Sequence, residues 1–141
     1  MELPWSFQYS IECNARRRFA WEYWTNIANW SDGPAKFELP GPFAVGSRLT
    51  TTLPDKTMHS VIRYVDRGQA ATIEMQLPDA TVSFHWLFED LPEMRTRITQ
   101  RLTLLTTNAD LVTQASLLEQ TVPQGMRKLI TAIQEASTRE T

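Results

Sequence analysis

The chain is poor in the residues that build disulfides, metal sites and membrane spans. It contains one cysteine, Cys13, and two histidines among its 141 residues. A single cysteine excludes an intrachain disulfide and favours a reducing compartment. No stretch approaches the roughly 18 uninterrupted apolar residues of a membrane-spanning helix. The first residues also lack a charged lead followed by an apolar run, so we recognise no secretory signal and expect a cytoplasmic protein.

Positive charge is scarce as well. The 14 Lys and Arg are outnumbered by 16 Asp and Glu, which gives a formal net charge of −2 at pH 7. This balance offers no basic footprint for nucleic acid. The one dense basic cluster is Arg16-Arg17-Arg18, in the first turn of a predicted helix, where the helix dipole disfavours cations. We interpret it as a solvated helix start rather than an anion or partner site.

What the chain does have is an ordinary globular composition with many large aromatics. Hydrophobic residues make up 42% and charged residues 21%, and there are five Trp. A chain of this length fits one domain and can bury about two thirds of its unfolded surface. Large aromatics fill cores and also line pockets for apolar or planar ligands. For any single Trp, core packing is the first interpretation.

The apolar pattern predicts strands and helices in a distinctive order. Period-two alternation predicts six strands, over residues 7–12, 47–53, 58–65, 71–77, 82–88 and 95–105. Asn14 is the predicted N-cap of a helix whose apolar stripe runs to Ala28, and Asn108 caps a further helix. Pro123 and Gly125 predict a kink or a fresh helix start near Val122. The Pro- and Gly-punctuated loop before residue 47 is expected to be irregular, and the short connections suit antiparallel neighbours.

This order of elements resembles the START-like superfamily, also called SRPBCC, and particularly its polyketide cyclase/dehydrase and lipid-transport branch. The resemblance is carried by Ala15, FAW at 19–21, Trp24 and Trp30, by FELPGPFAVGS at 37–47, by TRITQR at 96–101 and by PQGMRKL at 123–129. It covers nearly the whole chain, so residues 1–141 are expected to form a single domain of this type. The motifs are specific for the fold and not for a reaction.

The resemblance implies an α+β helix-grip fold. In that fold a curved antiparallel sheet of six to seven strands surrounds a long C-terminal helix, with short N-terminal helices and an internal cavity. Many members have seven strands, whereas the pattern here predicts six. Members bind lipids, sterols, polyketides, plant hormones and other mostly apolar molecules, and a minority catalyse cyclisation or dehydration. Fold alone therefore leaves the function open.

The alternation also predicts what faces the cavity. If each strand turns its more apolar face inward, no Asp, Glu, His, Lys or Arg of the strands points into the cavity. The side chains that then face outward are His59, Arg63, Glu74, His85, Glu89, Arg97 and Arg101. An acid-base enzyme needs a titratable group within reach of its substrate, so no catalytic residue is predicted. The predicted ligand-binding residues are Tyr9, Trp24, Trp30, Thr51, Ser60, Tyr64, Met75, Trp86, Gln100, Met126 and Ile130.

Several of these residues have two interpretations. Gln100 as a buried amide without partners costs roughly 1–3 kcal/mol, so it is expected to bond a neighbour, a water or a ligand. Tyr9 and Tyr64 either pack in the core or polarise a carbonyl group of a ligand. The methionines either fill the core or adapt their packing to different ligands. One β-bulge would reverse the facing of His59 or His85. With no carboxylate or Cys pair near them in sequence, we predict no metal site and no cofactor.

These observations support three hypotheses of function. The leading one is binding or transport of a small hydrophobic molecule, lipid-, polyketide- or aromatic-like, without chemistry of its own. The second is a polyketide aromatase/cyclase or dehydrase that acts by shaping its substrate, with Tyr64 and Gln100 orienting carbonyls. The third is a protein-interaction module, which would need a large exposed apolar patch. The expected partner is a small hydrophobic ligand, not nucleic acid, and a homodimer is left open.

Overall fold

The computed structural model describes residues 3–30 and 34–139, and in these ranges the chain forms one seven-stranded sheet, three α-helices and two short 3₁₀ turns. The strands are β1 (Leu3–Cys13), β2 (Lys36–Glu38), β3 (Arg48–Leu53), β4 (Lys56–Asp66), β5 (Ala70–Leu77), β6 (Ala80–Leu91) and β7 (Arg95–Thr106). The helices are α1 (Arg17–Trp24), α2 (Ala109–Ala115) and α3 (Leu118–Arg139), and the 3₁₀ turns are η1 (Ile27–Asn29) and η2 (Pro92–Met94).

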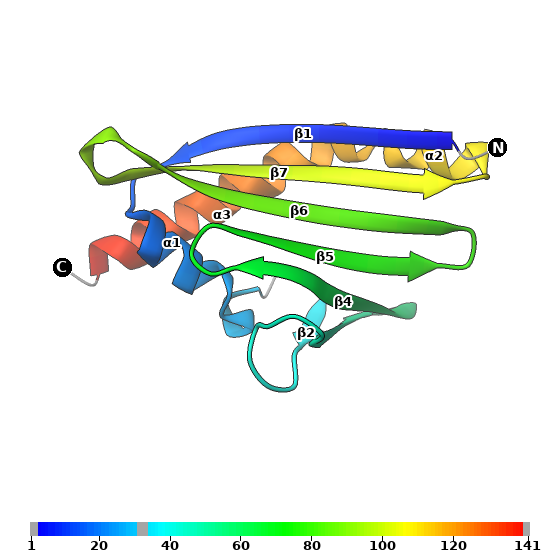
Figure 1. Cartoon of the computed structure of the whole chain (residues 1–141), viewed down its shortest axis with the longest axis horizontal. Helices are drawn as coiled ribbons and strands as arrows, with labels where there is room; N and C mark the ends of the chain where they lie inside the picture. Colours follow the sequence, from blue (N-terminus) through cyan, green and yellow to red (C-terminus); the bar gives the residue numbers. More distant parts are fainter. Residues whose placement is uncertain (1–2, 31–33, 140–141) are drawn as a thin grey trace.

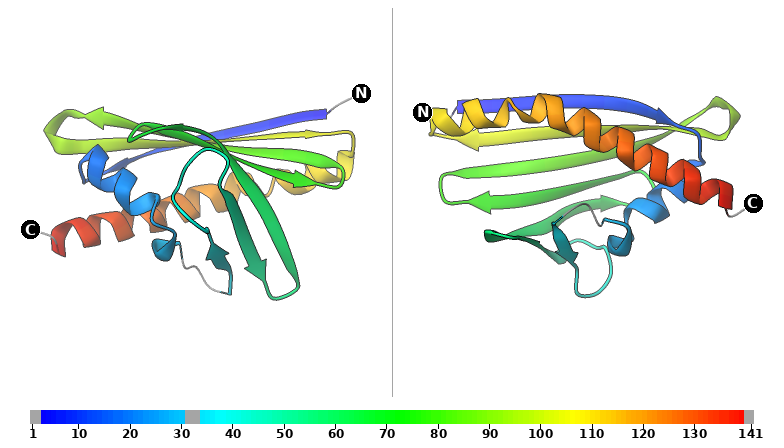
Figure 2. Two further views of the ribbon diagram at one scale, coloured as in Figure 1. Left: turned by 60° about the horizontal axis from the view of Figure 1, so that its bottom comes forward. Right: turned by 180° about the vertical axis from the view of Figure 1, so that it is seen from behind.

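The sheet is antiparallel throughout, in the order β1-β7-β6-β5-β4-β3-β2 (Figure 1). From β2 to β7 each strand pairs with the next along the chain, and β1 closes the far edge against β7. Figure 2 shows that the sheet is strongly curved and that α3 crosses its concave side, while the strands from β4 to β2 bend down toward η1. This is the α+β helix-grip architecture with a long C-terminal helix, so that prediction is confirmed.

The seventh strand was not predicted from the pattern. β2 lies inside the segment expected to be irregular, and it pairs with β3 from Lys36↔Thr52 to Glu38↔Thr50. Three residues are too few to show a period-two alternation, and the following Pro40, Gly41 and Pro42 mask the signal further. The strand extends the β3–β4 hairpin by one short edge strand.

The helix boundaries also differ from the prediction. Asn14 is not the N-cap: its backbone N–H donates to Gln134 Oε1 at 2.8 Å, and α1 begins after Arg16, whose side chain makes no capping bond. The stripe expected to run to Ala28 is divided at Thr25 into α1 and η1. The later break falls between α2 and α3 at residues 116–117, and Pro123 lies inside α3.

The concave side of the sheet carries two buried clusters. The larger, beneath α1, includes Cys13, Trp21, Phe88 and Ile98, and we call these four residues the packed end. The smaller cluster lies under α2 and is formed by Ala80, Leu104 and Ala115. None of the described helices has both the length and the apolarity needed to cross a bilayer.

Candidate functional site

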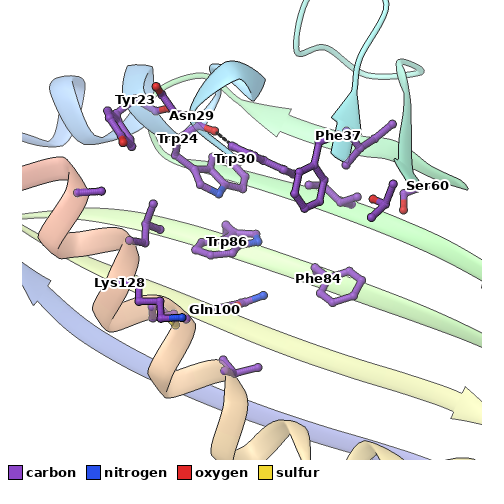
Figure 3. Close-up of a pocket in the computed structure, with 18 of the residues that line it drawn as sticks. Tyr23, Trp24, Asn29, Trp30, Phe37, Ser60, Phe84, Trp86, Gln100 and Lys128 are labelled. Atoms are coloured by element: carbon purple, nitrogen blue, oxygen red, sulfur yellow. Dashed lines mark hydrogen bonds between the residues drawn. The ribbon is translucent and has the colours of Figure 1, made fainter. Parts of the chain in front are cut away.

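A cavity of about 600 Å³ lies beside the larger buried cluster, whose Trp24, Ile73 and Met126 take part in its lining (Figure 3). Its volume is within the usual range for small-molecule sites. Its floor comes from β3 to β7 and its sides from α3 and the α1–η1 segment. The residues that line it are Tyr23, Trp24, Asn29, Trp30, Phe37, Leu49, Thr51, Met58, Ser60, Ile73, Met75, Phe84, Trp86, Gln100, Val122, Gly125, Met126, Lys128, Leu129 and Ala132.

One side of the cavity is a group of tryptophans. The ring centroids of Trp24 lie 4.9 Å from Trp86 and 5.8 Å from Trp30. The Trp30 indole N–H donates to the Trp24 carbonyl, which holds the two rings together although they come from α1 and the end of η1. Phe37 of β2 stands edge-on to Trp30, with ring centroids 5.6 Å apart. These rings present wide apolar faces to a ligand. Because packed aromatic side chains have few accessible rotamers, they lose little conformational entropy when a ligand binds.

Two of the six α3 residues that line the cavity are small. Gly125 and Ala132 of α3 both face it, and a Cβ placed on Gly125 would meet no atom within 4 Å. At the packed end, by contrast, Trp21 contacts Phe88 with a centroid separation of 5.4 Å. Small side chains on α3 thus leave open the volume that large side chains of α1 fill further along the sheet.

Three buried polar side chains in the lining have no hydrogen-bond partner among the described residues: Thr51, Ser60 and Gln100. They are 8%, 3% and 8% exposed, and no hydrogen bond is formed by their side chains. Every fully buried side-chain nitrogen or oxygen in residues 3–30 and 34–139 does have a partner. The free polar atoms of these three residues are therefore the ones that reach the open space of the cavity.

The expectation that no charged side chain lines the cavity is wrong at one position. Lys128 of α3 is part of the lining, and Figure 3 shows its ammonium on the cavity side of the helix. The prediction was based on the alternation of residues along the strands, and it did not include residues on the sides of the C-terminal helix. Lys128 stands three residues after Gly125 and four before Ala132, which places all three on one helical face.

Of the eleven predicted ligand-binding residues, the structure brings eight together in the lining: Trp24, Trp30, Thr51, Ser60, Met75, Trp86, Gln100 and Met126. Tyr9 and Ile130 instead pack against the larger buried cluster. The role of the eight in binding stays a prediction.

Tyr64 does not face the cavity, contrary to the prediction. The β4–β5 register shifts between Ile62 and Tyr64, so Arg63 is the extra residue of a β-bulge. Beyond the bulge Tyr64 pairs with Thr72 on the outer face, where it is 46% exposed and stacks on His85 at 6.5 Å between ring centroids. The inward position passes to Val65, which pairs with Ala71 and packs against the core.

The histidines and the cysteine lie outside the cavity lining. His85 Nδ1 lies 2.7 Å from the Thr72 hydroxyl, and His59 Nδ1 lies 3.4 Å from that of Thr50. Cys13 is fully buried at the packed end, and this burial raises the pKa of its thiol to about 11. Within the described ranges no three His, Cys, Asp or Glu side chains are grouped so that they could hold a metal ion.

Residues missed by the sequence reasoning come mostly from irregular segments and from α3. Tyr23 and Asn29 belong to the α1–η1 corner, where the Asn29 amide donates to the Tyr23 carbonyl at 2.9 Å. Phe37 sits on the unpredicted β2. Residues 31–33, which follow Trp30, lie outside the described ranges. For the lining residues of α3, the sequence feature that could have indicated their position is the spacing of Val122, Gly125 and Leu129, which places them on one helical face.

Comparisons with known proteins give the fold and no sequence family. A scan against protein-family models and a search of curated proteins both found no match. Among solved structures, norcoclaurine synthase from Thalictrum flavum is 15% identical, with 96% of this chain and 98% of that chain covered and a TM-score of 0.76. Ara h 8.0201 is 14% identical, with 97% and 99% covered and a TM-score of 0.70. A protein of unknown function from Staphylococcus aureus, SA2116, is 12% identical, with 96% and 98% covered and a TM-score of 0.70.

At sequence identities this low, the similarity shows a shared fold and nothing about function. It extends over nearly the full length of all three structures, the sheet order and the closing helix included. The chain therefore has the helix-grip fold of the Bet v1-like, or SRPBCC, proteins.

Proposed function

We propose that this chain binds or carries a small, largely apolar molecule in the cavity, without chemistry of its own. The observation that carries the proposal is an unfilled volume of about 600 Å³ in a concave face that is otherwise packed. Protein interiors normally have few voids larger than a water molecule, because each unfilled contact loses dispersion energy. A hollow of this size beside a buried cluster is better explained by an occupant than by poor packing.

The lining suggests what kind of molecule fits. The wall of Trp24, Trp30 and Trp86 favours a planar or ring-containing body, and Met75 and Met126 can adapt to its outline. A ligand that buries roughly 250 Å² of apolar surface gains about 6 kcal/mol before the cost of association. This gain alone corresponds to a dissociation constant of about 40 μM, so we expect simple probes to bind at tens of micromolar or more weakly. Among structures of the same fold, norcoclaurine synthase was solved with dopamine and hydroxybenzaldehyde, which are small aromatic molecules.

The two other hypotheses have less support. The polyketide cyclase or dehydrase hypothesis relied on Tyr64 and Gln100 to orient carbonyls, and Tyr64 lies on the outer face. Gln100 alone then remains for that role. The interaction-module hypothesis needs a contiguous apolar patch, whereas the exposed large hydrophobic residues of the described ranges come from five separate segments: Val45, Tyr64, Met94, Leu105 and Leu117.

The proposal can be tested by filling the cavity from the helix. Gly125→Phe would place a ring in the space that its Cβ faces, whereas Gly125→Ala adds one methyl group at the same position. The neutral dye phenylnaphthylamine, which fluoresces in apolar surroundings, serves as the ligand. We expect the wild type and Gly125→Ala to bind the dye with similar affinity. Gly125→Phe should bind it at least tenfold more weakly, with a melting temperature no lower than that of the wild type.

Two results would contradict this proposal. One is absence of dye binding by the wild type, and the other is equal binding by Gly125→Phe in a folded state. A second measurement is independent of the dye: native mass spectrometry of the purified protein should show an apolar compound that is released on denaturation.

A further inference from the structure

We infer that the cavity selects apolar molecules that carry an anionic head group, and that the Lys128 ammonium and the Gln100 amide bind this head group. The inference rests on the proposed function, because the head group is held only when the apolar body occupies the cavity. It goes further in assigning the ligand to one chemical class, organic acids with an apolar body.

The first observation is the isolation of Lys128. Among the described lining residues it is the only Asp, Glu, His, Lys or Arg. Its neighbours three and four residues away on α3 are Gln124, Gly125, Thr131 and Ala132, and all of them are uncharged. The ion pairs found in the described ranges are Arg17–Asp90, Arg18–Glu22, Arg63–Glu74 and Arg95–Glu12, so Lys128 takes part in none of them. Lys128 is exposed on the flank of α3, and its ammonium is free to bind an anion at the edge of the cavity.

The second observation is the free amide of Gln100. This side chain projects from β7 at the cavity floor and is only 8% exposed, yet it has no hydrogen-bond partner in the described part of the chain. Its register neighbours are Tyr9 on β1 and Trp86 on β6, and neither gives it a bond. The amide NH₂ supplies two donors, and an anionic oxygen accepts such bonds more strongly than a neutral one. Because Lys128 and Gln100 line the same cavity, a ligand bound there can meet both a positive charge and directed donors.

The charges elsewhere on the protein do not explain a preference for anions, so this preference would come from Lys128 and Gln100 themselves. The whole chain has a net charge of −2, so the general field of the protein does not attract anions. The nearest acidic residue along α3 after Lys128 is Glu135, seven residues on, which is about 10 Å along the helix axis. No Asp or Glu belongs to the described lining. An anionic head group beside Lys128 meets attraction, whereas an amine in that place meets repulsion.

The experiment compares two dyes that share one apolar body. Phenylnaphthylamine is neutral, and anilinonaphthalene sulfonate adds an anionic group to the same ring system. Each is titrated by fluorescence against the wild type, Lys128→Gln and the control Arg127→Gln. Arg127 is the neighbouring cation on α3 and is not a lining residue, so its variant removes the same charge without altering the cavity.

We expect Lys128→Gln to weaken binding of the sulfonate dye by up to about fivefold, as for an exposed ion pair. Its affinity for the neutral dye should stay within about twofold of the wild-type value, and Arg127→Gln should change neither dye by more than about twofold. Added salt should weaken sulfonate binding by the wild type more than by Lys128→Gln. Displacement of the neutral dye by dodecanoic acid, but less well by dodecanol, extends the result from sulfonate to carboxylate.

Three outcomes would overturn the inference. If Lys128→Gln weakens both dyes equally, Lys128 contributes only the packing of its stem, and the proposed function survives. If Arg127→Gln and Lys128→Gln weaken the sulfonate dye by the same factor, the effect belongs to the general surface charge. If the wild type binds neither dye, the proposed function itself is wrong. A Gln100→Leu variant that loses the preference for the acid over the alcohol would support the second half of the inference, and an unchanged preference would remove Gln100 from it.

Discussion

One strand shows both kinds of interior that this protein has. Phe84 and Phe88 stand on β6, four residues apart and on the same face. Phe88 is 1% exposed and lies 5.4 Å, between ring centroids, from both Trp21 and Trp24. Phe84 lines the cavity instead. The difference is made by the covering helix, because α1 places Trp side chains over Phe88, whereas α3 presents Gly125 to the cavity.

The polar groups divide in the same way. At the packed end the Thr96 hydroxyl is fully buried and donates to the Ala15 carbonyl at 2.7 Å. In the cavity Ser60 and Gln100 are almost as buried and have no partner among the described residues. A polar group that completes the fold is bonded within the chain, whereas one kept for a ligand or water is left free. This contrast suggests which side chains serve stability and which serve binding.

The largest expected effect comes from truncating the two phenylalanines. Phe88→Ala should lower the free energy of unfolding by about 3–5 kcal/mol, because it opens a void among packed rings. Phe84→Ala should cost only about 1–2 kcal/mol, since one side of that ring already faces open space. Urea unfolding measures both. Equal losses would show that the cavity is collapsed in solution and would remove the contrast.

A second prediction concerns the thiol at the packed end. Burial raises the pKa of Cys13 from 9.0 to about 11 in the folded chain. Because the folded pKa lies above the unfolded one, the stability that this group contributes is complete below about pH 9 and is lost as the pH rises toward 11. Relative to Cys13→Ala, the wild type should lose about 2 kcal/mol of unfolding free energy over that range. A constant difference between the two proteins would mean that Cys13 is reached by solvent.

A third prediction compares the hydroxyls. Thr96→Val should cost about 1–3 kcal/mol, because it leaves the Ala15 carbonyl buried without a donor. Ser60→Ala should change stability by less than about 0.5 kcal/mol, since its hydroxyl bonds nothing in the described chain. Chemical denaturation of both variants gives the comparison directly. A loss of more than about 1 kcal/mol in Ser60→Ala would indicate that Ser60 has a structural bond.

The smallest expected effect is a gain. Gly125 lies within α3 at a position where a Cβ meets no other atom. Gly125→Ala should therefore raise the free energy of unfolding by about 0.5–1 kcal/mol through helix propensity alone. A thermal melt detects this as a small increase in Tm. A decrease would show that the space around Gly125, on the cavity side of α3, is tighter than the structure indicates.

The sequence predicted the fold and much of the cavity because both follow from periodic patterns. Alternation placed Ser60, Trp86 and Gln100 on the inner face, and the structure has them there. It failed at Tyr64, because a β-bulge at Arg63 leaves no trace in a run where both residues are polar or amphipathic. It also missed the lining residues of short or irregular segments, such as Phe37 on β2. Lys128 was missed because a charge on a helix flank is normally solvated, and only the structure shows what the flank faces.

The most direct test of the central claim uses the five Trp indole N–H signals in a proton–nitrogen NMR spectrum. Trp86 and Trp30 line the cavity, whereas Trp5 packs near α2 outside it and Trp21 belongs to the packed end. On titration with phenylnaphthylamine the signals of Trp86 and Trp30 should shift in a saturable way, and those of Trp5 and Trp21 should stay in place. Shifts confined to Trp5, or none at all, would contradict an accessible apolar cavity.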